Sequence, residues 1–100
     1  MIDPGSLAKK LACYPNPFNP IVRIQIDASN VRDGDVEIFD VLGRRVRRFN
    51  VAPNSISELV WDARDDLGSP VSSGFYIVRL ATHQADGAMA TESQKILYLK

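Results

Sequence analysis

The sequence has little of several residue types from which sites and frameworks are built: its 100 residues include one cysteine and one histidine, and its net charge is zero. One cysteine excludes a disulfide framework within the chain, and a single cysteine with a single histidine argues against a zinc site made of these residue types. Twelve Lys and Arg residues balance twelve Asp and Glu residues, which argues against nucleic-acid binding through a basic surface. No apolar run approaches the roughly 18 residues of a membrane span.

What the sequence does contain is typical of one folded domain: 45% of its residues are hydrophobic and 24% are charged. The segment Met1–Ser6 (MIDPGS) lacks the apolar region of a signal peptide. We expect residues 1–6 to be a leader joined to an excised domain that spans residues 7–100. The alternative is that they begin a short natural cytosolic protein.

Apolar residues alternate with polar ones in six segments, which is the pattern of half-buried strands. These segments are 21–27, 35–42, 44–51, 57–61, 75–82 and 94–100, and turn signals lie between them at 32–34, 42–44, 53–55, 67–70 and 85–87. The pattern predicts an all-β, immunoglobulin-like antiparallel β-sandwich of about seven strands. The expected core is Val22, Ile24, Ile26, Val36, Ile38, Leu59, Trp61, Tyr76, Val78 and Leu80.

Two local motifs predict how the strands are connected. The segment Tyr14–Pro20 (YPNPFNP) has three prolines, which cannot lie in a central strand, so we expect a rigid arm at a sheet edge with Phe18 buried. Asp40 can accept hydrogen bonds from the following backbone, and Gly43 can supply a positive φ, so the two predict a hairpin turn. A bulge near residues 47–48 would bring Val46 and Phe49 onto one face.

No arrangement of residues predicts catalysis. No nucleophile–base–acid triad can be built around His83, which we expect in a solvent-facing loop, and Cys13 is expected to be buried and unreactive. There is no glycine-rich phosphate loop and no pair of catalytic carboxylates. The sequence therefore predicts a protein that is not an enzyme and has no cofactor.

Two charged clusters allow more than one interpretation. Arg44, Arg45, Arg47 and Arg48 place four cations in five residues. We interpret them as a solvated hairpin neutralised by Asp40, Glu37 and Glu58 that blocks edge pairing, the alternative being a patch for an anionic partner.

The second cluster, Asp62, Asp65 and Asp66 followed by Gly68, is expected to cap turns. The alternative is a calcium loop, although its spacing matches no EF-hand. Trp61 shares its face with Leu59, so it is expected in the core rather than as a platform for sugars.

Four blocks taken together resemble a known family. They are YPNPFNP at Tyr14–Pro20, IFDVLGRRV at Ile38–Val46, WDARDDLGSPVSSGFYIVRL at Trp61–Leu80 and KILYLK at Lys95–Lys100. In this order they resemble the C-terminal sorting domain of type IX (Por) secretion, whose pattern overlaps with the Ig-like domain of flagellar hook-capping proteins. The resemblance covers Cys13 to Lys100. The family has Gly after the Asp of its W-D-G element, where this chain has Ala63, and usually Ser or Thr where this chain has Ile21 and Val22.

The resemblance implies a non-catalytic module at the C-terminus of a larger secreted protein, acting as a secretion and cell-surface sorting signal. The implied partners are an N-terminal passenger and the outer-membrane secretion machinery, reached through the periplasm, with no nucleic acid, no membrane span and a monomeric state. The late elements of the family map onto Gly74, Tyr76, Lys95 and Lys100. The other motif residues are expected to be structural: Tyr14, Pro15, Asn16, Pro17, Phe18, Asn19, Pro20, Asp40, Gly43, Trp61, Asp62, Asp65 and Gly68.

Two further functions remain open, a structural Ig-like spacer or assembly module and, more distantly, a carbohydrate-binding module. The end of the chain at Lys100, directly after the last expected strand, favours the sorting signal. We expect that strand to present an exposed edge for strand addition, with Lys95 and Lys100 as point charges for a partner.

Overall fold

The computed structural model describes residues 10–100, so the expected leader Met1–Ser6 lies outside the described residues. Seven strands follow one another along the chain: β1 (Leu11–Tyr14), β2 (Val22–Ala28), β3 (Val31–Phe39), β4 (Arg45–Asn50), β5 (Ser55–Trp61), β6 (Gly74–Gln84) and β7 (Met89–Tyr98). Within this part of the chain, no helix is long and apolar enough to cross a membrane.

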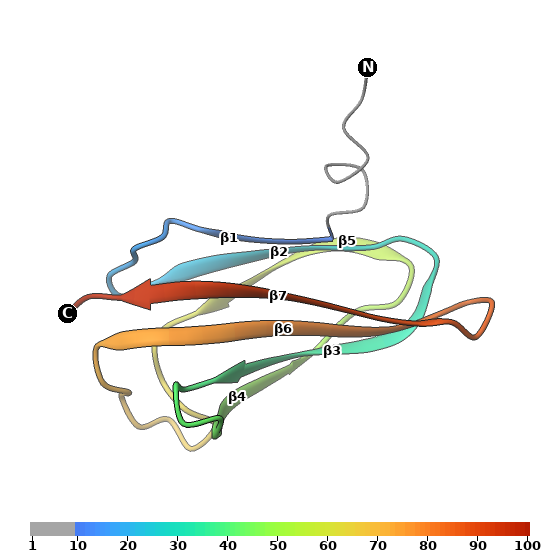
Figure 1. The fold of residues 1–100 in the computed structure, drawn as a ribbon. Helices are drawn as coiled ribbons and strands as arrows, with labels where there is room; N and C mark the ends of the chain where they lie inside the picture. The colour runs from blue at the N-terminus through green and yellow to red at the C-terminus, as the bar shows by residue number, and fades with distance from the viewer. Residues whose placement is uncertain (1–9) are drawn as a thin grey trace.

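The strands form two antiparallel sheets, one with the order β1-β2-β5 and the other with the order β4-β3-β6-β7. The sheets lie face to face, and β6 and β7 extend as a long hairpin beyond the rest of the sandwich (Figure 1). This arrangement confirms the predicted immunoglobulin-like β-sandwich. It also brings strands that are distant in sequence into one surface, since β3 pairs with β6.

The core lies between the two sheets and confirms the alternation read from the sequence. Nine of the ten predicted core residues are buried, and the tenth, Leu59, is half-buried and packs against them. Phe18 from the proline arm is also buried, as expected, and its ring lies 5.1 Å from that of Tyr98 and 5.7 Å from that of Trp61. The arm therefore fills the core at one end of the sandwich.

The expected turn at residues 32–34 is wrong, because these residues lie inside β3. The turn comes earlier, at residues 29–30, where Asn30 has a φ of 61° and the Asp27 carboxylate accepts hydrogen bonds from Ser29. Gly34 serves a different purpose: a Cβ there would lie 2.8 Å from the carbonyl oxygen of Ala81. The glycine allows β3 and β6 to approach closely and does not reverse the chain.

A bulge in β4 reconciles its mixed pattern, close to where it was predicted. Ile38 lies opposite Arg47 and Phe39 opposite Arg45, so Val46 is the extra residue. Because of this insertion, Val46 and Phe49 both pack against the core.

The expectation that the last strand presents an exposed edge is wrong over its final residues. The Asn16 side chain accepts a hydrogen bond from Leu97 N (2.9 Å) and donates one to Lys95 O (3.2 Å). The next contact is made by the backbone of Phe18, which donates to Leu97 O (2.9 Å) and accepts from Leu99 N (3.1 Å). The proline arm thus covers the end of β7.

Farther along, β1 closes the same side of the sandwich. Glu92 on β7 accepts hydrogen bonds from the backbone N–H groups of Lys10 and Leu11, and Gln94 exchanges two with the backbone of Cys13. The edge strand of the three-stranded sheet is therefore β1, which ends just before the prolines. The side chains of Glu92 and Gln94 join this strand to β7 of the other sheet.

Candidate recognition surface

The four residues implied by the family resemblance converge on one end of the four-stranded sheet. Gly74 opens β6 and lies opposite Tyr98, and Lys95 lies opposite Ile77. The backbone N–H of Lys100 donates to the Ser73 hydroxyl at 3.1 Å. The β3–β4 turn and the loop before β6 lie at this same end, near the C-terminus (Figure 1).

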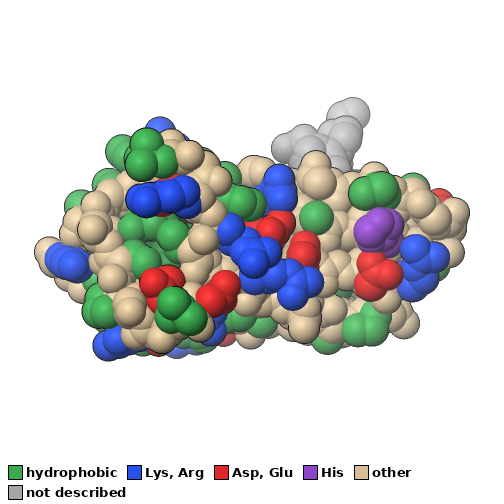
Figure 2. Space-filling model, turned by 90° about the horizontal axis from the view of Figure 1, so that it is seen from below, with side chains coloured by type: hydrophobic (Ala, Val, Ile, Leu, Met, Phe, Trp, Pro, Cys, Tyr) green, Lys and Arg blue, Asp and Glu red, His purple; other side chains and the backbone are tan. Residues whose placement is uncertain are grey.

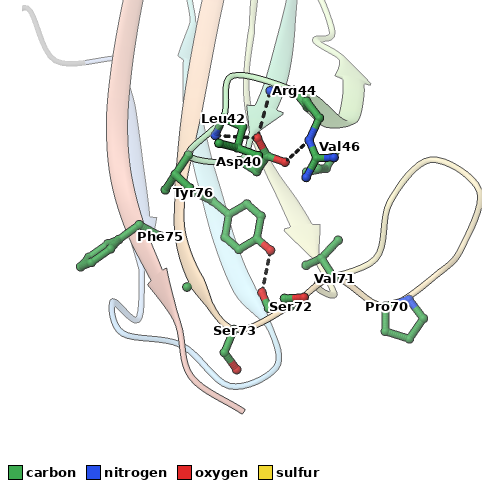
Figure 3. Close-up of a pocket in the computed structure, with 12 residues that line it drawn as sticks. Asp40, Leu42, Arg44, Val46, Pro70, Val71, Ser72, Ser73, Phe75 and Tyr76 are labelled. Carbon is green, nitrogen blue, oxygen red and sulfur yellow. Dashed lines mark hydrogen bonds and ion pairs between the residues drawn. The ribbon is translucent and has the colours of Figure 1, made fainter.

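Tyr76 supports this end from inside. Its ring is buried and meets Trp61 edge-on at 5.2 Å, and its hydroxyl donates to the Ser72 carbonyl at 2.6 Å (Figure 3). Burial, together with the charge of Asp40, raises the pKa of the Tyr76 hydroxyl, so the ring stays neutral at physiological pH. Tyr76 thus shapes the surface by fixing the loop before β6.

Gly43 has the positive φ predicted for it, and Gly74 at the start of β6 has one as well. Their φ angles are 81° and 146°, and a Cβ at either position would meet no atom within 4 Å. The requirement for glycine is therefore conformational and not a matter of space.

The β3–β4 turn is organised by Asp40, as predicted. Its carboxylate accepts hydrogen bonds from Leu42 N (2.9 Å), Arg44 N (3.0 Å) and Arg44 Nε (2.8 Å) (Figure 3). Desolvation acts to raise the pKa of Asp40, but the hydrogen bonds from Arg44 and Leu42 outweigh it and lower the pKa. The turn therefore presents a fixed and locally neutralised carboxylate.

A hollow of about 340 Å³ separates this turn from the loop before β6. Asp40, Val46, Val71 and Tyr76 are among its lining residues, and Figure 3 shows the Tyr76 ring pointing into it while Phe75 points to the other side of β6.

A second hollow, of about 660 Å³, lies on the outer face of the four-stranded sheet, and we call it the outer groove. Sequence reasoning identified only Lys95 and the turn residues in it. The missed signal is that Phe39, Phe75 and Ile77 are apolar at outward-facing positions. The residues that line it are Phe39, Asp40, Val41, Gly43, Phe75, Ile77, Arg79, Ser93 and Lys95.

The arginine cluster is neutralised almost as expected. Arg44 pairs with Asp40 (2.8 Å), Arg45 with Glu37 (3.2 Å), Arg47 with Asp66 (3.5 Å) and Arg48 with Asp35 (3.0 Å). Blue and red side chains accordingly alternate across the middle of this face in Figure 2. This supports the solvated hairpin over a dedicated anion patch.

Glu58, the third expected neutralising residue, lies on the other sheet. It binds Arg23 at 3.1 Å and accepts a hydrogen bond from the Tyr14 hydroxyl. It therefore contributes nothing to neutralising the arginine cluster.

The three aspartates of the acidic loop have separate structural partners. Asp65 accepts from Leu67 N and Ser69 N, and Gly68 N donates to the Asp65 carbonyl at 2.9 Å. Asp66 accepts from Arg48 N, while Asp62 lies 4.0 Å from Arg64. Among residues 10–100, no group of three or more His, Cys, Asp or Glu residues is placed to hold a metal ion.

Three single residues were also assigned from the sequence. Trp61 is fully buried, with its Nε1 donating to Arg64 O at 2.8 Å, so it is no platform for sugars. Cys13 is buried, as expected. His83 lies within β6 and not in a loop, 2.7 Å from the Asp33 carboxylate.

A family model described as "Secretion system C-terminal sorting domain" matches residues 12–96 of the chain. A search of curated proteins found no relative.

Solved structures show the same fold. The chain is similar to part of dimeric latent PorU from Porphyromonas gingivalis, with a TM-score of 0.73, 23% identity and coverage of 90% of this chain and 9% of that one. It is also similar to part of PorZ, described as an essential bacterial surface component of the type-IX secretion system of P. gingivalis, with a TM-score of 0.61, 24% identity and coverage of 90% and 11%. FlgD from Xanthomonas campestris, described as a hook-capping protein, gives a TM-score of 0.63, 17% identity and coverage of 88% and 64%. The chain thus spans about a tenth of the length of the first two.

Proposed function

This chain belongs to the family of secretion system C-terminal sorting domains, and from that membership we propose that it acts as a sorting signal of type IX secretion for a larger secreted protein. In this proposal residues 7–100 form the sorting signal, which has no catalytic role of its own. An N-terminal passenger crosses the periplasm and is delivered by outer-membrane machinery to the cell surface or the medium. The family match over residues 12–96 is the observation that carries the proposal.

The surface chemistry of one end of the sandwich supports this proposal. A folded signal must be read from its surface, and Lys95 and Lys100 both lie at this end. Neither lysine has an ion-pair partner among residues 10–100, whereas the arginines of β4 all do. Their charges are therefore available to a partner.

A reporter fusion tests the sorting role. The domain is attached to the C-terminus of a secreted reporter in a host with a type IX system, and export is compared for the unmodified domain and for Lys95→Ala with Lys100→Ala. We expect export to fall roughly tenfold in the double variant because two uncompensated charges are lost. The melting temperature should move by less than about 2 °C, since both side chains lie outside the core.

A matched control removes two cations elsewhere. Lys10→Ala with Arg32→Ala deletes the same charge from residues that pair with Asp27 and Asp33, and it should leave export unchanged. Full export by a reporter lacking residues 95–100 would contradict the sorting role. It would favour the structural spacer, for which the fold similarity to FlgD is the supporting observation.

A further inference from the structure

The outer groove has an apolar floor built from three adjacent strands. Phe39 lies opposite Ile77, and Ile77 lies opposite Lys95, so the three form one row across β3, β6 and β7. Phe75 and Val41 extend the floor and are 44% and 73% exposed. Figure 2 shows hydrophobic side chains gathered at one end of this face, beside the band of charged side chains.

The groove also carries an excess of positive charge. Glu37 is shared by two guanidinium groups, those of Arg79 (2.6 Å) and Arg45 (3.2 Å). Asp40 is occupied by Arg44, and Lys95 has no carboxylate partner among the described residues. Toward the other end of the same face the charges balance, since Asp35 holds Arg48. This excess of positive charge favours a ligand that brings negative charge.

Two aromatic rings fix the cations at the groove. The Arg79 guanidinium lies 4.9 Å from the centre of the Phe39 ring, and the Lys95 ammonium lies 4.3 Å from that of Phe75. These contacts hold the charges in place before a partner arrives. Each cation lies over one face of its ring, and the Phe75 side chain stays 44% exposed as part of the groove floor.

We propose that the outer groove docks an acidic protein segment in which carboxylates flank an aliphatic side chain. The aliphatic group would lie on Ile77 between the two rings, and the carboxylates would reach Lys95 and Arg79. The charge excess favours an acidic partner, and the apolar floor of Phe39, Ile77 and Phe75 favours a protein segment with an aliphatic side chain over an acidic polysaccharide. The proposal rests on the sorting role and names the chemistry of the partner that reads this end of the domain.

Binding is measured by NMR titration of the isotope-labelled 100-residue chain. The probe is a synthetic peptide of alternating glutamate and leucine, and the control peptide has lysine in place of glutamate. We expect saturable shift changes centred on Ile77, Arg79 and Lys95 with the acidic peptide alone. Absence of binding, or shifts spread over both sheets, would overturn the proposal. Equal binding of oligogalacturonate would also overturn it, in favour of an acidic polysaccharide.

Variants separate the charge from the apolar floor. Lys95→Glu and Phe75→Ser should each weaken peptide binding roughly tenfold. Lys95→Arg keeps the positive charge and should bind the peptide as the unmodified chain does. The matched controls are Arg32→Glu for the charge reversal and Val60→Ser for the lost apolar surface. The exposed fraction of Val60 is 47%, which is similar to the 44% of Phe75, but Val60 lies on the other sheet. Controls that weaken binding as much as the groove variants would contradict the proposal.

Export by the reporter fusion distinguishes the two proposals. If the unmodified domain directs export and Lys95→Glu with Phe75→Ser exports equally well, the groove proposal fails and the sorting role stands. If the unmodified domain directs no export, the sorting role fails, and the peptide titration still decides whether the groove binds acidic segments.

Discussion

At the scale of single residues, Ala63 stands out because it holds a conformation that normally calls for glycine. Its φ is 61°, its side chain is 2% exposed, and its carbonyl accepts a hydrogen bond from Val71 N at 2.9 Å. A left-handed backbone costs an L-residue about 1–2 kcal/mol, so the buried methyl group must offset much of that strain.

Two substitutions at Ala63 test this balance. Ala63→Gly should change the free energy of unfolding by less than about 1 kcal/mol, because relief of the strain is offset by lost burial and by the greater chain entropy of glycine. Ala63→Val should cost about 2 kcal/mol or more, since a β-branched side chain resists positive φ and overfills the site. Urea denaturation measures both, and an equally stable valine variant would contradict this account.

At the scale of the elements, the proline arm acts as a partial strand along β7. The carboxamide of Asn16 both donates and accepts, as a peptide group does, and so satisfies Lys95 O and Leu97 N. The backbone of Phe18 then continues the pairing. An edge that could template aggregation or strand addition is closed in this way.

Replacing Asn16 tests the cover directly. Asn16→Ala removes two hydrogen bonds and should lower the free energy of unfolding by about 1–2 kcal/mol. The Leu97 amide should exchange with solvent faster relative to the rest of β7. Asn19→Ala is the matched control, because Asn19 also precedes a proline yet covers no strand. Equal exchange at Leu97 in both variants would show that the arm does not protect this edge.

The elements also show how far the sequence could predict the structure. The strict alternation of apolar and polar residues in β2 and β6 predicted their buried faces correctly. Alternation within one strand identifies the buried face even when the neighbouring strands are unknown. Gly34 was misassigned to a turn, because its close approach to the Ala81 carbonyl becomes visible only when β3 is paired with β6. The arm on β7 could not be predicted, because it joins residues about 80 positions apart.

The candidate site was predictable only in part for the same reason. The motifs indicated Lys95 and the turn at Asp40, which are local features. Joining Phe39, Ile77 and Lys95 in one row depends on the register of three strands, and alternation within each strand does not fix that register.

At the scale of the whole molecule, stability depends on carboxylates spread over both sheets. The pKa of Glu37 is lowered chiefly by its hydrogen bond from Arg79, and that of Glu58 by its hydrogen bonds from Tyr14 and Arg23. Hydrogen bonds from Ser29 lower the pKa of Asp27. Each group is a stronger acid in the folded chain than in the unfolded chain, so the fold is favoured while these groups are ionised.

This linkage predicts the pH dependence of stability. Ordinary carboxyl pKa values are 3.8 for Asp and 4.5 for Glu, so on acidification the unfolded chain takes up protons before the folded one. The free energy of unfolding should be nearly constant from pH 7 to about pH 5 and should fall progressively below about pH 4.5. At alkaline pH, the raised pKa of Tyr76 predicts a further fall in the free energy of unfolding above about pH 10.0, because the tyrosine of the unfolded chain ionises first.

Denaturant titrations across this range, at low and high salt, measure the effect. Glu37→Gln removes the carboxylate shared by Arg45 and Arg79, so it should lower stability at pH 7 and make the acid decline shallower. High salt should weaken the decline as well, because these ion pairs lie near the surface and are screened. A wild-type stability that stays flat to about pH 3 would show that the ionised carboxylates add nothing to the fold.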